Sequence, residues 1–208
     1  MNLLDHKIIS TGSKGNCVII DNVMIDCGVP FAKIKEHLYS VSTLLLTHIH
    51  SDHIKESTLK NIVILFPHIK IFGNYEVCQV FSEYPINCIN EGVPFEDDGI
   101  DFTPFKAIHD VLTYGYTWVN AEGESIIYVT DTADLRNAPV QTYDHFFIES
   151  NHDEKKIDGM KFDTRFGYNV YAGAKRHLST QKCKLFFYLN RRSSDSTLTE
   201  LHMSSRFY

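Results

Sequence analysis

The sequence lacks the features that mark membrane and secreted proteins. No apolar run approaches the roughly 18 residues that a membrane-spanning helix needs, and residues 1–12 show no charged segment followed by a long apolar stretch. We therefore expect no secretory signal and no membrane partner. The five cysteines form no C-x-x-C pair and are odd in number. This predicts a reduced, cytoplasmic setting in which each cysteine is a small buried side chain.

Internal repeats, low-complexity tracts and Pro/Gly/Ser linkers are also missing from the 208 residues. A chain of this length can bury one sizeable core. We therefore predict a single domain over residues 1–208, and a homodimer is one assembly that the sequence allows.

The net charge of -6 is unevenly distributed along the chain. Residues 1–154 hold 9 basic and 22 acidic side chains, whereas residues 155–192 hold 10 basic and 2 acidic ones. Such asymmetry indicates either a surface for an anionic partner or a solvated basic face without a ligand.

Strands and helices alternate in both halves of the sequence, which favours an α/β sandwich over a parallel Rossmann sheet. The apolar patterns predict strands at 6–10, 17–20, 23–26, 43–47, 69–72, 86–89, 100–108, 114–119, 125–129, 145–148 and 185–189. They predict helices at 30–38, 54–61, 75–81, 170–177 and 180–183.

Four potential metal ligands follow the apolar strand that ends at Thr47, namely His48, His50, Asp52 and His53. His48 and His50 are two residues apart, so an extended backbone points both to the same side. Asp52 and His53 come after the chain turns toward the next helix and can face a second position. Imidazole nitrogens with a carboxylate oxygen suit Zn²⁺, Mn²⁺ or Fe²⁺.

The H-x-H-x-D-H pattern after an apolar strand resembles the signature of the metallo-β-lactamase superfamily. The resemblance implies an αββα sandwich of two mixed sheets flanked by helices. It also implies further ligands in a fixed order, which this chain matches with His109, Asp131 and His177. Asp26, in Met-Ile-Asp-Cys-Gly, matches the family's aspartate that supports the metal loop without ligating.

The same resemblance implies two divalent ions, Zn or Mn. The first would be held by His48, His50 and His109, and the second by Asp52, His53 and His177, with Asp131 shared. Two such ions can activate one water near neutral pH and take up charge on a phosphoryl or acyl oxygen. Asp52 would also orient that water. The remaining histidines show no ligand pattern and are expected to be structural or exposed: His6, His37, His68, His145 and His202.

Two segments narrow the chemistry. Residues 10–17, Ser-Thr-Gly-Ser-Lys-Gly-Asn-Cys, are similar to the start of the WalJ/YycJ-like branch, which is associated with DNA exonuclease or phosphodiesterase activity. Residues 149–153, Glu-Ser-Asn-His-Asp, occupy the place where RNase Z-like enzymes carry a Glu/His element for proton transfer. His152 is therefore the expected general acid and Glu149 its orienter.

The basic segment 155–192 lies between this expected acid and the last expected ligand. Arg165 and Arg176 can hold phosphates bidentately, and Tyr168 and Tyr171 can stack a base or pack in a core. The sequence thus predicts a nuclease or phosphodiesterase acting on nucleic acid or a nucleotide.

Other functions stay open at the sequence level. A compact relative that hydrolyses cyclic nucleotides, such as those some phages use against nucleotide-signalling defences, is the runner-up. A thioester or lactone hydrolase and a non-catalytic binding domain are further alternatives. Departures from the branch include Arg176 where a glycine usually precedes His-Leu-Ser, and no recognisable second strand end with a histidine after residues 187–192.

Overall fold

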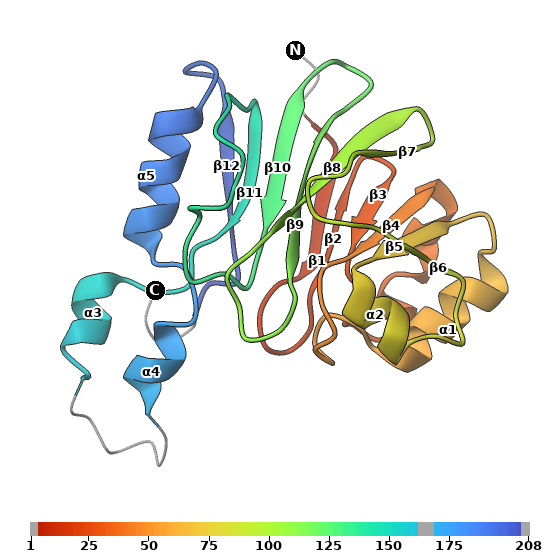
Figure 1. Ribbon diagram of the computed structural model, residues 1–208, viewed down its shortest axis with the longest axis horizontal. Coiled ribbons are helices and arrows are strands. Elements are labelled where there is room, and N and C mark those ends of the chain that lie inside the picture. The colour runs from red at the N-terminus through yellow and green to blue at the C-terminus, as the bar shows by residue number, and fades with distance from the viewer. Residues whose placement is uncertain (1–3, 162–168, 205–208) are drawn as a thin grey trace. The chain divides into compact units, whose positions relative to one another are not determined.

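The computed structural model describes residues 4–161 and 169–204. It divides into two compact units, Met1–Gly99 and Ile100–Tyr208 (Figure 1). Together they hold two mixed six-stranded sheets, in the orders β1-β2-β3-β4-β5-β6 and β12-β11-β10-β9-β8-β7. Among the described residues, no helix combines the length and the apolar character that a bilayer span requires. The single-domain organisation stays a prediction.

The first sheet begins with antiparallel strands and continues with parallel ones. β1 (His6–Ser10), β2 (Cys17–Ile20) and β3 (Val23–Ile25) are antiparallel neighbours. β4 (Thr43–Leu46), β5 (Lys70–Gly73) and β6 (Ile86–Cys88) then add in parallel. Because β4 is buried along its whole length, its sequence is a continuous apolar run rather than an alternating one.

Helices connect the parallel strands of this unit. α1 (Glu56–Leu65) follows β4, and α2 (Tyr75–Val80) follows β5 and packs against β5 and β6 (Figure 1). The predicted helix at 30–38 is instead two short 3₁₀ helices, η1 (Phe31–Lys33) and η2 (Lys35–Ser40). Their backbone bonds span three residues, a tighter winding that suits short connections. Ile34 and Leu38 still point into the core, as the pattern predicted.

The second sheet is antiparallel at one side and parallel at the other. β8 (Ile100–Lys106), β9 (Tyr114–Val119) and β10 (Ser125–Val129) form a meander that follows β7 (Phe95–Asp97). β11 (His145–Glu149) and β12 (Thr197–Leu201) extend it in parallel with β10. The carboxyl ends of β10, β11 and β12 therefore lie at one edge of the sheet.

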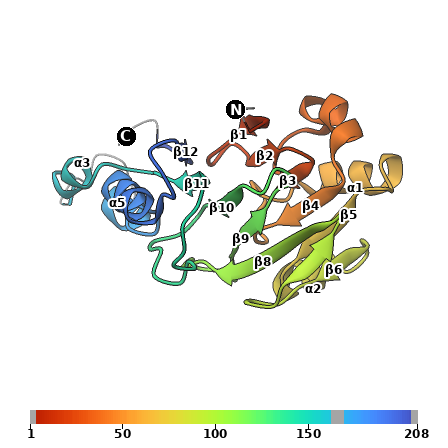
Figure 2. The ribbon, with the colours of Figure 1, turned by 90° about the horizontal axis from the view of Figure 1, so that it is seen from above.

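The C-terminal part differs from the sequence expectation. Residues 180–183 and 185–189, predicted as a helical turn and a last strand, form one helix, α5 (Thr180–Asn190). Ser179 caps it by accepting a hydrogen bond from the Lys182 amide. Phe187 packs on Phe146 of β11, and both ribbon views show α5 beside β11 (Figure 2). The apolar run Leu-Phe-Phe-Tyr-Leu thus has one partly buried and one exposed helix face, and its contact with β11 decides its conformation.

Two short helices complete the second unit. α3 (Glu154–Asp158) begins at the Asp153 cap. α4 (Val170–Ala174) begins at the Asn169 cap and ends before His177, three residues earlier than predicted. The strand β12 was not predicted at all, and its recognition matters for the site described next.

Candidate metal centre

The loop after β4 places two imidazoles beside each other. The Nε2 atom of His48 lies 3.0 Å from the Nδ1 atom of His50. Two ligands of a tetrahedral zinc ion with bonds of 2.0–2.1 Å lie about 3.3 Å apart. The pair therefore has a spacing that suits two ligands of one ion, as the alternation of an extended backbone predicts.

Asp26 holds this loop in place through hydrogen bonds to its carboxylate. Its carboxylate accepts hydrogen bonds from the Thr47 amide (2.8 Å), the Thr47 hydroxyl (2.8 Å) and His53 Nδ1 (2.6 Å). The side chain is fully buried. Burial raises the pKa of Asp26, while His53 and Thr47 act in the opposite direction. Asp26 also has a positive φ of 60°, a strained conformation of the kind that gathers at functional sites.

Asn16 determines which nitrogen of His53 carries the proton. The Gly12 amide donates to Asn16 Oδ1 at 2.7 Å, so the NH₂ group of Asn16 is the one that lies 2.8 Å from His53 Nε2. An amide NH₂ group can only donate, so His53 Nε2 accepts and Nδ1 donates to Asp26. His53 Nε2 thus keeps a lone pair, as a metal ligand requires, and the carboxylate on the other nitrogen is the support that ligating histidines usually have.

Gly28 allows the loop to approach β3 closely. A Cβ atom at this position would lie 1.7 Å from the carbonyl oxygen of Asp52, so only glycine fits. The same carbonyl accepts a 2.6 Å hydrogen bond from the backbone N–H of Asn16. The Asp52 carboxylate is partly exposed and lies 3.9 Å from His53 Nε2. Both N-terminal motifs, residues 12–16 and 24–28, therefore hold the His48–His53 loop.

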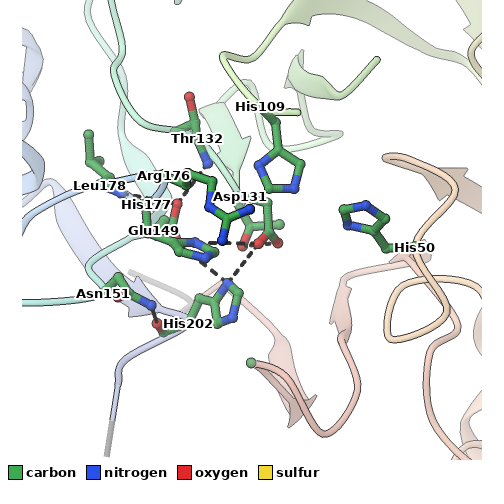
Figure 3. Close-up of polar contacts among 12 residues, drawn as sticks. His50, His109, Asp131, Thr132, Glu149, Asn151, Arg176, His177, Leu178 and His202 are labelled. Carbon is green, nitrogen blue, oxygen red and sulfur yellow. Dashed lines mark hydrogen bonds and ion pairs between the residues drawn. The ribbon is translucent and has the colours of Figure 1, made fainter. Parts of the chain in front are cut away.

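A second cluster lies at the carboxyl ends of the parallel strands in the C-terminal unit (Figure 3). It consists of Asp131 after β10, Glu149 at the end of β11, His177, and His202 after β12. Their potential ligand atoms all lie within 4.8 Å of one another. Parallel strands bring their carboxyl ends to one edge, so three chain segments far apart in sequence deliver side chains to one place.

Glu149 is the centre of this cluster. One carboxylate oxygen lies 2.6 Å from His177 Nδ1 and 3.3 Å from His202 Nδ1, and the other accepts from the Thr132 amide at 2.8 Å (Figure 3). Burial raises the pKa of Glu149, but the hydrogen bonds from His177 and His202 outweigh it, so the net shift is downward. The buried carboxylate is therefore ionised and fixes both imidazoles.

His202 is the residue that the sequence analysis missed. It was expected to be structural or exposed; it is buried, and its Nδ1 lies 3.1 Å from Asp131 Oδ1, beside the predicted ligands. Burial lowers the pKa of His202, but hydrogen bonds and charges of Asp131 and Glu149 raise it to about 11. Asp131 and His202 both have positive φ, 50° and 53°. A histidine directly follows the alternating residues 197–201, much as His48 follows the predicted strand at 43–47. This was the signal that the sequence analysis missed.

The expected pairing of Glu149 with His152 is not the one observed. Glu149 hydrogen-bonds His177 instead. His152 is almost completely buried, and its Nδ1 has no hydrogen-bond partner among the residues that the structure describes. Burial and the positive charge of Lys175 lower the pKa of His152, which makes its neutral form dominant near pH 7. A neutral imidazole donates a proton less readily than an imidazolium, and the general-acid role of His152 stays a prediction.

The structure also describes three more of the residues that the sequence predicted for the site. His109 is nearly buried beside Asp110, with its ring centroid 6.1 Å from that of His177. Arg176 is exposed, 3.9 Å from Asp110. The Tyr171 ring lies under the Lys175 ammonium at 5.3 Å. Arg165 and Tyr168 lie outside the described residues.

The basic segment is largely paired with acids. The described side chains with a carboxylate within 4.0 Å include Lys175, Arg176, Lys182, Lys184 and Arg192. Their partners belong to the same unit, so part of the excess charge is neutralised within the fold. Lys155 and Lys156 on α3 are exposed. The surface available to an anionic partner is therefore smaller than the sequence count suggests.

Comparisons with known proteins agree with this architecture. The chain is 24% identical to "Exodeoxyribonuclease WalJ" of Streptococcus pneumoniae over 198 residues, covering 85% of this chain and 72% of that protein. The solved structure of the metallo-β-lactamase fold protein YhfI from Bacillus subtilis matches with a TM-score of 0.73 at 14% identity, covering 96% of this chain and 86% of that one.

The short form of human tRNase Z matches with a TM-score of 0.67 at 15% identity, covering 97% and 93% of the two chains. A diphosphatase from the PhnP family matches with a TM-score of 0.65 at 16% identity, covering 96% and 86%. These similarities confirm the predicted fold class. The family model described as the beta-lactamase superfamily domain matches residues 21–160, more than half of the sequence. The chain therefore belongs to the beta-lactamase superfamily.

Proposed function

We propose that this protein is a metal-dependent hydrolase of phosphodiester bonds. The observation that carries the proposal is the buried cluster of Asp131, Glu149, His177 and His202 at the strand ends of the C-terminal unit. Relatives named as an exodeoxyribonuclease, a tRNase Z and a diphosphatase support the phosphodiester specificity. The donor set of imidazoles and carboxylates fits a transition metal such as Zn²⁺ or Mn²⁺.

Two divalent ions are proposed, with ligands from both halves of the sequence. His48, His50 and His109 would hold one, and Asp52 and His53 the other, with Asp131 shared. Bound ions of this kind supply a nucleophile from water at neutral pH and take up charge on a phosphoryl oxygen.

The last ligand is the point at which geometry changes the sequence-based assignment. The sequence pattern assigns His177, whose Nδ1 makes the shorter contact with Glu149, 2.6 Å against 3.3 Å for His202 Nδ1. His202 Nδ1 lies closer to Asp131 Oδ1 than His177 Nδ1 does, 3.1 Å against 3.5 Å. We therefore assign His202 as the last ligand.

With His202 as the last ligand, we assign delivery of the proton to the Glu149–His177 pair. Cleavage of a phosphodiester leaves an alkoxide oxygen that must gain a proton. Burial lowers the pKa of His177, but the hydrogen bond and charge of Glu149 raise it above its usual value. The raised pKa enlarges the protonated fraction of His177 near neutral pH, and Glu149 holds the ring in one orientation, as a general acid needs. His152 is the alternative acid.

Metal content and turnover of variants test these roles. Purified protein should carry close to two transition metals per chain, and His50→Ala together with Asp131→Ala should abolish metal binding and turnover. His202→Ala should lose metal, whereas His177→Ala should keep it. His177→Ala should slow hydrolysis of substrates with poor leaving groups by about 10²–10⁴-fold and spare p-nitrophenyl esters, whose leaving group needs no proton.

The outcomes separate the alternatives. Metal loss in His177→Ala with metal retained in His202→Ala would restore the sequence-based assignment. A leaving-group-dependent loss in His152→Ala would return the acid role to that residue. Wild-type protein that binds no metal after reconstitution with Zn²⁺ or Mn²⁺ would refute the proposal as a whole.

The substrate is proposed as a nucleic acid strand, with a cyclic mononucleotide as the second candidate. The net positive segment 155–192 favours a polymer, and its many internal ion pairs weaken that preference. Hydrolysis of single- and double-stranded DNA, cyclic mononucleotides, bis-p-nitrophenyl phosphate, a thioester and a lactone should be compared. Turnover of only the thioester or lactone would refute phosphodiester specificity.

Salt dependence distinguishes the two nucleotide substrates. For a polymer, a plot of log affinity against log salt concentration should have a slope of about -0.7 per single-strand phosphate contacted. For a mononucleotide the slope should be shallow. Lys155→Glu with Lys156→Glu should weaken only polymer binding, because these exposed side chains carry charge on α3. Lys33→Glu with Lys35→Glu, the same change of charge at two exposed lysines of the N-terminal unit, is the matched control.

A further inference from the structure

Two of the five cysteines lie side by side, away from the metal ligands in sequence. Cys78 is on α2 and Cys88 ends β6. Cys88 pairs in register with Gly73 of β5, and the Cys78 sulfur lies 3.6 Å from the Gly73 carbonyl oxygen. Both thiols are reduced, and they are hydrogen-bond partners of each other. The packing of α2 on the β5–β6 edge therefore brings the two sulfur atoms together.

Accessibility sets this pair apart from the other cysteines. Cys88 is exposed and Cys78 is half-buried. The other three, Cys17, Cys27 and Cys183, are completely buried. A dissolved oxidant therefore reaches Cys88 first, and Cys78 is the nearest thiol to whatever forms there.

We propose that Cys78 and Cys88 form a thiol pair that small-molecule disulfides oxidise reversibly to an internal disulfide. The Cys88 thiolate attacks one sulfur of oxidised glutathione, whose S–S bond breaks and releases one glutathione thiolate. Cys78 then attacks the Cys88 sulfur of the mixed disulfide and releases the second glutathione. The two protons lost by the cysteines are taken up by the two glutathione thiolates, so two protein thiols are oxidised and one glutathione disulfide is reduced.

The order of attack agrees with the local electrostatics. Burial, with smaller contributions from the hydrogen bond and charge of Cys88, raises the pKa of Cys78 to about 12. Cys78 is thus a poor first nucleophile, since the thiolate is the reacting form. Once Cys88 is in a mixed disulfide, its hydrogen bond and negative charge no longer act on Cys78. The second step is also intramolecular, which favours it over release of the mixed disulfide.

The disulfide would connect α2 to the last strand of the first sheet. β6 is a three-residue strand at the edge of that sheet, paired with β5 alone among the described strands. A covalent bond to α2 restricts the unfolded chain and should raise the melting temperature by roughly 5–10 °C.

The test is titration of the metal-reconstituted protein with oxidised glutathione. The wild type should lose two hydrogens in mass, and its thiols counted after denaturation should fall from five to three. Peptide mapping should find Cys78 joined to Cys88, and dithiothreitol should reverse the change. Cys78→Ser should stop at a mixed disulfide on Cys88, and Cys88→Ser should not react.

Three results would overturn the proposal. They are a stable mixed disulfide on the wild-type protein, a disulfide between two chains through Cys88, and the same mass loss in Cys88→Ser. Cys88 is exposed, so its replacement by serine removes no buried contact, and circular dichroism will verify the fold of both variants. The expected rise in melting temperature on oxidation should be absent from both.

Discussion

Replacing Asp26 by Asn should weaken metal binding by moving the proton of His53 from Nδ1 to Nε2, although Asp26 is not itself a proposed ligand. In the native protein the Asp26 carboxylate accepts from two Thr47 donors and from His53 Nδ1. An amide has one accepting oxygen and one donating NH₂ group. If its oxygen faces Thr47, its NH₂ group faces His53 Nδ1. His53 then has to move its proton to Nε2, the nitrogen that would bind the ion.

The magnitude follows from these contacts. A lost charge-assisted hydrogen bond in a buried position costs about 1.5–3 kcal/mol of unfolding free energy. Loss of a residue that orients a ligating histidine lowers metal affinity by about 10–100-fold. We therefore expect Asp26→Asn to lose about 2 kcal/mol of stability without metal and at least a further tenfold in affinity.

Urea unfolding of the chelated protein and metal competition titrations measure the two effects separately. Asp97→Asn is the matched control, since Asp97 is also a buried aspartate of the first unit and accepts from Thr43 and Lys70 at 2.7 Å. The control should lose comparable stability but keep its metal affinity. Unchanged affinity in Asp26→Asn, or an equal loss in Asp97→Asn, would show that the tautomer of His53 is not what Asp26 controls.

Three further predictions concern the same regions. Gly28→Ala should cost about 1–3 kcal/mol of unfolding free energy and reduce bound metal, because its Cβ would overlap the Asp52 carbonyl; full metal content would contradict this. Asn74→Asp keeps the cap of α2 but loses the 3.0 Å bond to the Thr47 carbonyl, so it should weaken metal binding while leaving helix content by circular dichroism unchanged. Burial lowers the pKa of His202, but Asp131 and Glu149 raise it to about 11. The stabilisation that protonated His202 gives the metal-free protein is therefore complete below about pH 6.5 and is lost as the pH rises toward 11. If the unfolding free energy of a chelated sample stayed level from pH 7 to 10, the pairing of His202 with Asp131 and Glu149 would be refuted.

Local signals in the sequence predicted most of the candidate ligands in the N-terminal unit. His48, His50, Asp52 and His53 lie within six residues of one strand end, and the supporting Asp26 and Gly28 belong to one short motif. Such spacing is readable because the alternation of a strand and the turn after it fix where neighbouring side chains point. The strands around these residues were predicted within one or two positions for the same reason.

The tertiary structure decided the C-terminal site. Glu149 and His202 come from segments that the parallel pairing of β10 with β11 and of β11 with β12 brings together, and His177 joins them through its hydrogen bond with Glu149. The sequence could not show that residues 185–189 are helical, because their apolar run suits a strand equally well until Phe187 packs on Phe146. That error hid β12 and with it His202. The sequence by itself determined which potential ligands follow the strand before His48, since their spacing is a local signal, whereas the partners of Glu149 were decided by long-range contacts, which local patterns do not encode.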